Sequence, residues 1–335
     1  MFLHSNKNLK AKDQKVAIVT GSSTGIGFET CLLFARNGIL TYATMRDLTK
    51  ADLIQNIAEK EKLPLKVIHM DVDKDDSVVR AFKEISEDHE TGMRIDILVN
   101  NAGFGLFGAL EDQSIEHIKK QFETNLFGAI RTIQRVLPVM RNQRSGVVVN
   151  ISSISGQIGF PAQPVYVSTK FALEGLSESF AYEVQPYGIS VILIEPGVIN
   201  TNFVENIMIP YNTQRISSHL LSPSSDSASQ TVTYSGGPES NGEMTPYANV
   251  VKRFLRHYYP AMRNASSPKE VAKVVLESIN DSVISSTSQG GNNNNNNNNN
   301  FYRYLVGEDA KFYAHAKRKM SDSELRSFVA KRILS

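Results

Sequence analysis

The chain has 335 residues, of which 41% are hydrophobic, and its formal net charge at pH 7 is +2. This length can bury a large core, and the small net charge gives no electrostatic reason to expect nucleic acid or an anionic membrane surface as a partner. Cys31 is the single cysteine, which excludes an internal disulfide and fits a reducing compartment. No segment reaches the roughly 18 apolar residues of a membrane span. We therefore expect a cytoplasmic protein without a membrane span.

A glycine-rich turn joins the first expected strand, at 15–20, to a helical pattern that covers 28–37. Gly21, Gly25 and Gly27 allow a tight turn and a close approach of the backbone to a pyrophosphate at the helix N-terminus. The spacing differs from the commonest dinucleotide fingerprint and lacks the lysine of a phosphate-binding P-loop. A glycine-rich turn without a ligand is therefore the alternative interpretation.

Further short apolar runs alternate with helical periodicity along the chain, which is typical of an α/β fold with a doubly wound parallel sheet. Such runs fit parallel strands that are buried on both faces. Right-handed crossovers between these strands place a ligand at their carboxyl ends. The expected strands cover 38–44, 65–70, 95–99, 146–151 and 189–194.

Tyr166 and Lys170 are four residues apart, so in a helix their side chains lie on one face. An ammonium near the phenol favours phenolate and lowers the pKa of the tyrosine, which would make the pair a usable acid and base near neutral pH. The same spacing also occurs on ordinary solvated helix faces. The chemical interpretation therefore depends on the motifs found elsewhere in the chain.

These motifs resemble, in order and spacing, those of the short-chain dehydrogenase/reductase family in its single-domain branch, closest to the group with 17-beta-hydroxysteroid and retinol dehydrogenases. The resemblance covers residues 14–205 firmly and implies a Rossmann fold, a nicotinamide cofactor, and hydride transfer between a ketone or aldehyde and an alcohol. The landmarks are Thr20-Gly21-x-x-x-Gly25-Ile26-Gly27, Asn100-Asn101-Ala102-Gly103, Asn125, Ser153, Tyr166-x-x-x-Lys170 and Pro196-Gly197.

The resemblance assigns catalytic roles to four residues. Tyr166 would exchange a proton with the substrate oxygen, and Ser153 would hydrogen-bond to that oxygen. Lys170 would lower the pKa of Tyr166 and bind the nicotinamide ribose. The backbone of Asn125 would hold a water molecule beside the lysine. Without the resemblance, an asparagine in a helix would be interpreted as an ordinary surface residue.

The end of the second expected strand bears on the choice of cofactor. An acidic side chain there binds the ribose hydroxyls of NAD, whereas an arginine accommodates the 2′-phosphate of NADP. Met45 stands where relatives that use NAD carry aspartate, and Arg46 follows it, so we expect NADP(H) to be preferred over NAD(H). In the alternative interpretation, Arg46 is a solvated charge and Asp47 is a helix cap.

Other residues that the resemblance places around the cofactor come from several loops. Asp71 and Val72 would contact the adenine, Asn101 and Gly103 would lie under the adenosine ribose, and residues 195–201 would wrap the nicotinamide. No metal site is expected, because the histidines lack metal-ligand spacing. The predicted cofactor-binding residues are Gly21, Ser23, Thr24, Gly25, Ile26, Gly27, Arg46, Asp71, Val72, Asn101, Gly103, Tyr166, Lys170, Pro196, Gly197, Ile199 and Thr201.

We expect one domain with a C-terminal extension that covers the substrate. Its parts are a dinucleotide-binding and catalytic core at 14–205, a substrate-covering segment at 206–265, and C-terminal helices with a last strand at 266–335. Residues 216–245, rich in Ser, Gly, Thr and Pro, form either a lid or an inert insertion. Residues 290–300 end in a run of asparagines and form a low-complexity loop.

The expected substrate is a small hydrophobic carbonyl compound or alcohol, because the apolar segments 103–108 and 160–162 flank the catalytic strand ends. Core packing is the alternative for these segments. A non-catalytic dinucleotide-binding sensor and an epimerase or lyase that retains its cofactor are the competing functions.

Helices around 115–140 and 164–186 are expected to form a homodimer or homotetramer interface. Glu174 and Glu178 are expected on the solvent side of the second helix.

Overall fold

A computed structural model describes residues 14–88, 90, 94–201, 207, 209–210, 234–235, 246–287 and 300–335. The proposed lid at 216–245, apart from residues 234–235, and the asparagine loop at 290–299 lie outside the described residues. Within the described part of the chain, no helix is long and apolar enough to cross a membrane.

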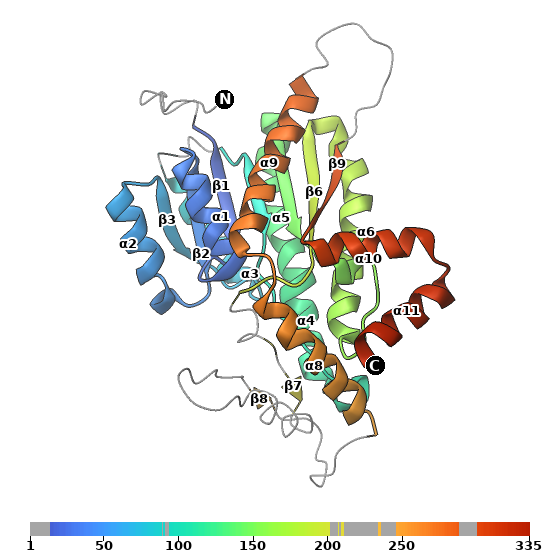
Figure 1. The fold of residues 1–335 in the computed structure, drawn as a ribbon. Coiled ribbons are helices and arrows are strands. Elements are labelled where there is room, and N and C mark those ends of the chain that lie inside the picture. The colour runs from blue at the N-terminus through green and yellow to red at the C-terminus, as the bar shows by residue number, and fades with distance from the viewer. Residues whose placement is uncertain are drawn as a thin grey trace, which may run out of the picture.

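Seven parallel strands form the central sheet, in the order β3-β2-β1-β4-β5-β6-β9 (Figure 1). The strand order changes direction between β1 and β4, and this change leaves a crevice at the carboxyl ends of the two strands. The predicted doubly wound Rossmann fold is confirmed. The strands are β1 Val16–Thr20, β2 Leu40–Met45, β3 Leu65–His69, β4 Ile97–Asn100, β5 Gly146–Ile151, β6 Ile189–Pro196 and β9 Phe301–Val306.

Helices cover both faces of the sheet, because alternate strand residues point to opposite sides. Ala17 and Val19 of β1 pack with α1, α2 and α9, whereas Val16 and Ile18 pack with α3, α5 and α6 (Figure 1). Every residue of β1 is buried, as expected for a strand between two helical layers. The helices are α1 Gly25–Arg36, α2 Asp52–Glu61, α9 Pro268–Thr287, α3 Asp75–Glu87, α5 Gly128–Gln143 and α6 Pro164–Val184.

A third apolar cluster lies at the carboxyl ends of the strands. There α8, Ala248–Arg263, packs near α10, Glu308–Lys319, and α11, Asp322–Leu334 (Figure 1). Two-residue strands β7, Ile209–Pro210, and β8, Tyr234–Ser235, pair separately from the main sheet. β9 extends the main sheet beside β6, so the C-terminal part of the chain joins the same sheet. The predicted domain boundaries themselves stay predictions.

The strand boundaries differ from the predicted ones in two informative places. β2 begins at Leu40 and not at residue 38, because Gly38 has a φ of +78° and belongs to the turn after α1. β6 continues to Pro196, two residues beyond the predicted end, because β9 pairs with it as far as Val306. The loop that follows β6 therefore begins at Gly197.

Candidate active site

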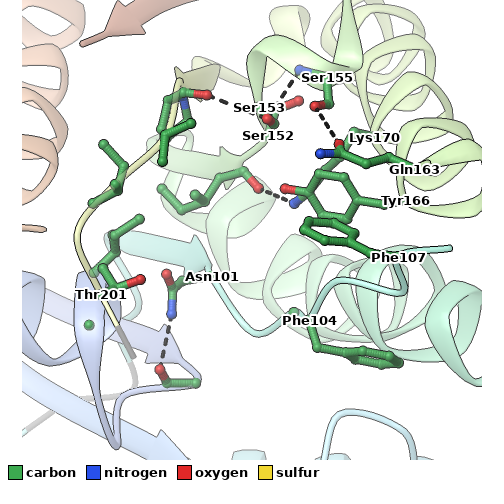
Figure 2. Close-up of a pocket in the computed structure, with 18 of the residues that line it drawn as sticks. Asn101, Phe104, Phe107, Ser152, Ser153, Ser155, Gln163, Tyr166, Lys170 and Thr201 are labelled. Atoms are coloured by element: carbon green, nitrogen blue, oxygen red, sulfur yellow. Dashed lines mark hydrogen bonds between the residues drawn. The ribbon is translucent and has the colours of Figure 1, made fainter. Parts of the chain in front are cut away.

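A cleft of about 1430 Å³ opens at the carboxyl ends of the strands. Pockets for drug-sized molecules usually measure about 300–1,000 Å³, so this cleft has room for a dinucleotide and a second molecule. Every predicted site residue except Gly27 and Asn125 lines it. Figure 2 shows part of the cleft, with Asn101 and Thr201 on one side and the catalytic candidates on the other.

The glycine turn after β1 depends on three glycines for different reasons. Gly21 and Gly25 have φ values of +67° and +61°, which disfavour other residues. A Cβ atom on Gly27 would lie 2.5 Å from Asn101 Nδ2 and from the carbonyl oxygen of Gly21. Asn101 donates from Nδ2 to the carbonyl oxygens of Thr20, at 2.9 Å, and Gly21, at 3.0 Å. The turn is therefore held tightly against the end of β4.

The N-terminus of α1 faces the cleft through Ser23, Thr24, Gly25 and Ile26. Thr24 precedes the helix, and its side chain makes no capping hydrogen bond. The first turn of α1 also carries no acidic side chain. These features suit an anion, because backbone N–H groups and the positive end of the helix dipole are directed toward the cleft.

At the end of β2, Met45 is buried while Arg46 is exposed and lines the cleft. Asp47 Oδ1 accepts hydrogen bonds from the Thr49 backbone N–H, at 3.1 Å, and from Thr49 Oγ1, at 2.6 Å. Asp47 therefore caps the short helical turn that begins at Leu48, as the alternative interpretation expected. Arg46 is the cationic group that β2 brings to the part of the cleft near the glycine turn.

Asp71 and Val72 follow β3 and also line the cleft. Asp71 Oδ1 accepts a hydrogen bond from the backbone N–H of Asp73 at 3.1 Å, which fixes the turn after the strand. Val72 packs directly on Gly128, where a Cβ atom would lie 2.8 Å from the valine side chain. The structure places this pair as expected, and its contact with adenine stays a prediction.

The catalytic candidates come together from the segment just after β5 and from α6 (Figure 2). The Tyr166 side chain hydrogen-bonds with the Ser153 side chain, which also accepts from the Ser155 backbone N–H at 3.1 Å. Lys170 Nζ donates to the carbonyl oxygen of Ile151 at 2.8 Å and lies 5.7 Å from the centroid of the Tyr166 ring. A hydroxyl, a phenol and an ammonium thus meet at one point of the cleft wall.

Burial has opposite effects on the two acid/base groups. It raises the pKa of Tyr166 to about 12, although the hydrogen bond with Ser153 acts in the lowering direction. It lowers the pKa of Lys170 to about 8, against the raising effect of the negative charge on Glu174. The expected net lowering of the Tyr166 pKa is wrong for this geometry, because removal of the phenol from water has the larger effect.

Asn125 is buried in a π-helical turn, Glu123–Phe127, between α4, Ile115–Phe122, and α5. Its Oδ1 accepts from the backbone N–H of Phe104 at 3.0 Å. Its Nδ2 donates to the carbonyl oxygen of Phe104, at 3.0 Å, and to Thr169 Oγ1, at 3.1 Å. The side chain thus fixes the loop after β4 against α6, so Asn125 is not an ordinary surface residue. Its water-binding role stays a prediction.

Sequence reasoning missed Asp309, which holds the loop after β6 from the start of α10. Its Oδ2 accepts from the backbone N–H of Val198 at 2.7 Å. A Cβ atom on Gly197 would lie 2.0 Å from Asp309 Oδ1, so glycine is required there. Ile199 forms a β-bridge with Ser266. The signal that could have found Asp309 is its place just after the carboxyl end of the last strand.

Beyond Tyr166 the cleft wall is aromatic. The Phe107 ring centroid lies 6.0 Å from that of Tyr166 and 5.3 Å from that of Tyr258, both edge to face. Phe254 stacks on Tyr258 at 5.5 Å. Phe107 therefore fits both interpretations of the segment 103–108, because its side chain is buried in an apolar cluster and also lines the cleft. Phe254 and Tyr258 lie on α8, which sequence reasoning did not connect with the site.

Two further titratable residues, Cys31 and Glu174, are buried. Burial raises the pKa of the Cys31 thiol to about 12, which keeps the thiol inside α1 in its unreactive protonated form. The placement of Glu174 on the solvent side of α6 is wrong, because β6 and β9 contribute groups that enclose its carboxyl group; only Glu178 is exposed. Among the described residues, no three His, Cys, Asp or Glu side chains are grouped as metal ligands would be.

The sheet topology and the dinucleotide-sized cleft define a Rossmann-type α/β protein. The chain belongs to the short-chain dehydrogenase family, because the family model described as short chain dehydrogenase matches residues 15–211. It is therefore an oxidoreductase of that family, as the sequence motifs indicated.

Relatives of known name belong to the group that the motifs resemble. Retinol dehydrogenase 8 of Bos taurus is 33% identical over 277 residues, which cover 80% of this chain and 78% of the relative. The 17-beta-hydroxysteroid dehydrogenase type 1 of Homo sapiens is 35% identical over 273 residues, with coverages of 79% and 74%. A solved short-chain dehydrogenase from Streptomyces avermitilis has a TM-score of 0.68 and 25% identity, with coverages of 95% and 96%.

Proposed function

We propose that the protein is an NADP(H)-dependent oxidoreductase that interconverts a hydrophobic ketone or aldehyde with the corresponding alcohol. The observation that carries this proposal is the meeting of Ser153, Tyr166 and Lys170 at the cleft wall, between the glycine turn and the aromatic wall. A bound nicotinamide would supply or accept the hydride. The glycine turn, the α1 N-terminus and the volume of the cleft fit such a cofactor.

The proton chemistry follows from the hydrogen bonds at this point. The raised pKa keeps Tyr166 protonated at neutral pH, which is the form that donates a proton to a carbonyl oxygen during reduction. Ser153 donates a hydrogen bond to the same oxygen and stabilises its developing negative charge. Lys170, held by the carbonyl oxygen of Ile151, stabilises the phenolate as it forms. Oxidation of an alcohol uses the same groups in reverse.

The preference for NADP(H) is supported by the end of β2. Arg46 lines the cleft, Met45 is buried, and the Asp47 side chain accepts two hydrogen bonds from Thr49. An arginine guanidinium suits the 2′-phosphate of NADP, because it forms charge-assisted hydrogen bonds in a fixed geometry.

A hydrophobic substrate is supported by the aromatic wall of Phe107, Phe254 and Tyr258 beside Tyr166. The names of two relatives, a retinol dehydrogenase and a hydroxysteroid dehydrogenase, point to the same class of substrate. Aromatic side chains present large apolar surfaces, and planar or elongated apolar molecules gain most from them.

The test of this proposal is the oxidation of NADPH, followed by its absorbance, with a series of hydrophobic ketones and aldehydes. We expect catalytic consumption of NADPH that depends on the carbonyl compound. A non-catalytic sensor would bind NADPH without consuming it, and an epimerase or lyase would convert its substrate while leaving the cofactor unconsumed. Either result would contradict the proposed function.

We also propose a homodimer or homotetramer that forms through the helices between residues 115 and 186. Ile115 of α4, Phe127 before α5 and Tyr182 of α6 are large apolar or aromatic side chains that stay exposed in the single chain. Symmetric burial of such a surface is the usual way to remove it from water. Sedimentation velocity should therefore show a dimer or tetramer, with Tyr182→Glu shifting the distribution toward monomer. A monomer at all concentrations would contradict the assembly.

The remaining parts of the proposal concern partners and location. The formal net charge of +2 gives no reason to add nucleic acid to the partners, and the single cysteine is consistent with a cytoplasmic location. Fractionation of cells that express the protein would test the location, and recovery in an oxidising compartment would contradict it.

A further inference from the structure

A second group of titratable side chains lies behind Lys170, outside the cleft wall. Glu195 is the next-to-last residue of β6 and is fully buried, while Glu174 lies one helical turn after Lys170 on α6 and is 7% exposed. The two carboxyl groups are within hydrogen-bond reach of each other. Neither residue lines the cleft. The mechanism described above uses neither of them.

The two carboxyl groups have too few donors for two negative charges. Arg303 Nε lies 3.2 Å from Glu174 Oε2 and 3.5 Å from Glu195 Oε1. Gln157 Nε2 donates to Glu195 Oε2 at 2.6 Å. Glu174 Oε1 and Glu195 Oε1 are both buried, and neither accepts a hydrogen bond from a donor group among the described residues. Two adjacent buried carboxylates repel each other strongly, and binding one proton between them removes the repulsion.

The charged groups around the pair come from three elements. α6 contributes Lys170 and Glu178, β9 contributes Arg303, and α10 contributes Lys317, which bonds to the carbonyl oxygen of Gln157. Tyr166 faces Lys170 from the preceding turn of α6, and β5 contributes the carbonyl oxygen of Ile151. Among these groups, Glu174 is the carboxylate whose negative charge raises the pKa of Lys170.

We propose that Glu174 and Glu195 share one proton, and that the single negative charge left on the pair keeps Lys170 protonated. The pair therefore acts through the lysine as a set of positioning residues for the acid/base chemistry of the proposed function, on which this inference rests. The proton is shared through a hydrogen bond between the carboxyl groups, so no bond to the substrate or cofactor is involved.

The directions of the pKa shifts of Glu195 and Lys170 agree with this arrangement. Burial, and then the negative charge of Glu174, raise the pKa of Glu195 well above its usual range, which favours a proton on the pair. Burial lowers the pKa of Lys170 to about 8, and the charge of Glu174 opposes this lowering. Loss of the Glu174 charge would leave the burial effect unopposed, and Lys170 would lose its proton at a lower pH.

The three isosteric variants Glu174→Gln, Glu195→Gln and Glu178→Gln separate this role from a structural one. Glu178→Gln is the matched control, because Glu178 also binds Arg303, at 2.7 Å, but has a side chain that is 55% exposed and lies two turns from Lys170. Glu174→Gln should lower the titration midpoint of Lys170 by roughly one pH unit. Glu195→Gln should raise it, because Glu174 then carries the whole negative charge. Glu178→Gln should leave it unchanged.

The direct measurement is NMR of the full-length protein labelled with 13C at lysine Cε, with the Lys170 signal assigned by its loss in Lys170→Arg. The alkaline limb of the pH profile of kcat should move in the same directions as the NMR midpoint. A lowered melting temperature in Glu174→Gln without a change in the Lys170 midpoint would overturn the proposal. Equal shifts in Glu174→Gln and Glu178→Gln would also overturn it.

A second variant keeps the test decisive if Glu174→Gln does not fold. In that case an unchanged or lowered Lys170 midpoint in Glu195→Gln overturns the shared proton, and a raised midpoint supports it. The NMR readout also separates this inference from the proposed function. If the wild-type protein never consumes NADPH while the midpoints shift as expected, the carboxyl pair is supported and the proposed reaction is wrong.

Discussion

Replacement of Tyr166 by phenylalanine should lower kcat for ketone reduction by about 10²–10⁴-fold, the usual contribution of a general acid. The substitution removes the hydroxyl that bonds to Ser153 and would donate the proton. The ring itself can keep its edge-to-face contact with Phe107, and Lys170 can keep its 2.8 Å bond to the carbonyl oxygen of Ile151. NADPH affinity should therefore stay close to that of the wild-type protein.

The measurements are kcat at saturating NADPH and the Kd of NADPH from its fluorescence. Tyr258→Phe is a matched control, because Tyr258 is also a partly buried tyrosine on the cleft wall, and both rings contact Phe107 edge to face. It should alter kcat far less, because the proposed mechanism gives its hydroxyl no proton to transfer. Near-normal turnover in Tyr166→Phe would end the proposed acid/base role. Equal losses in the two variants would show that packing of the aromatic wall, and not proton transfer, limits the rate.

Replacement of Arg46 by aspartate should weaken NADPH binding by about 10–100-fold, because a hydrogen bond to a charged group contributes about 1.5–3 kcal/mol. The new carboxylate would also repel the 2′-phosphate. NADH lacks this phosphate, and a carboxylate at the end of β2 can bind its ribose hydroxyls, so NADH affinity should stay constant or rise. Separate titrations of NADPH and NADH give the two Kd values.

Arg80→Asp controls for the change in net charge, because Arg80 lies on an exposed face of α3 beside Asp76 and does not line the cleft. This variant should bind both cofactors like the wild-type protein. An equal loss of NADPH and NADH affinity in Arg46→Asp would show that Arg46 supports the cleft in general. Unchanged NADPH affinity would contradict the assignment of Arg46 to the phosphate.

Local sequence patterns were sufficient for the parts of the site that depend on nearby residues. The glycine turn follows from Gly21, Gly25 and Gly27, whose backbone and steric requirements are fixed within a few residues and by Asn101. The spacing of Tyr166 and Lys170 placed both on one face of α6. Short, continuous apolar runs similarly located the central strands, because parallel strands are buried on both faces.

Features that depend on distant segments could not be predicted in this way. Glu174 has the spacing of a surface residue, but Arg303 of β9, 129 residues later, encloses it. Asp309 reaches the loop after β6 from 111 residues away. The direction of the Tyr166 pKa shift depends on how deeply the phenol is buried, which the spacing of Tyr166 and Lys170 does not reveal. These properties arise from tertiary packing and not from local periodicity.

The most direct test of the central claim is the fate of the hydride. NADPH that carries deuterium at C4 of the nicotinamide, on the transferred face, is incubated with the wild-type protein and a hydrophobic ketone that it consumes. Mass spectrometry of the alcohol should show one deuterium at the carbinol carbon for each NADPH oxidised. An alcohol without deuterium, or conversion of the substrate with the labelled cofactor left unconsumed, would contradict the proposed oxidoreductase reaction.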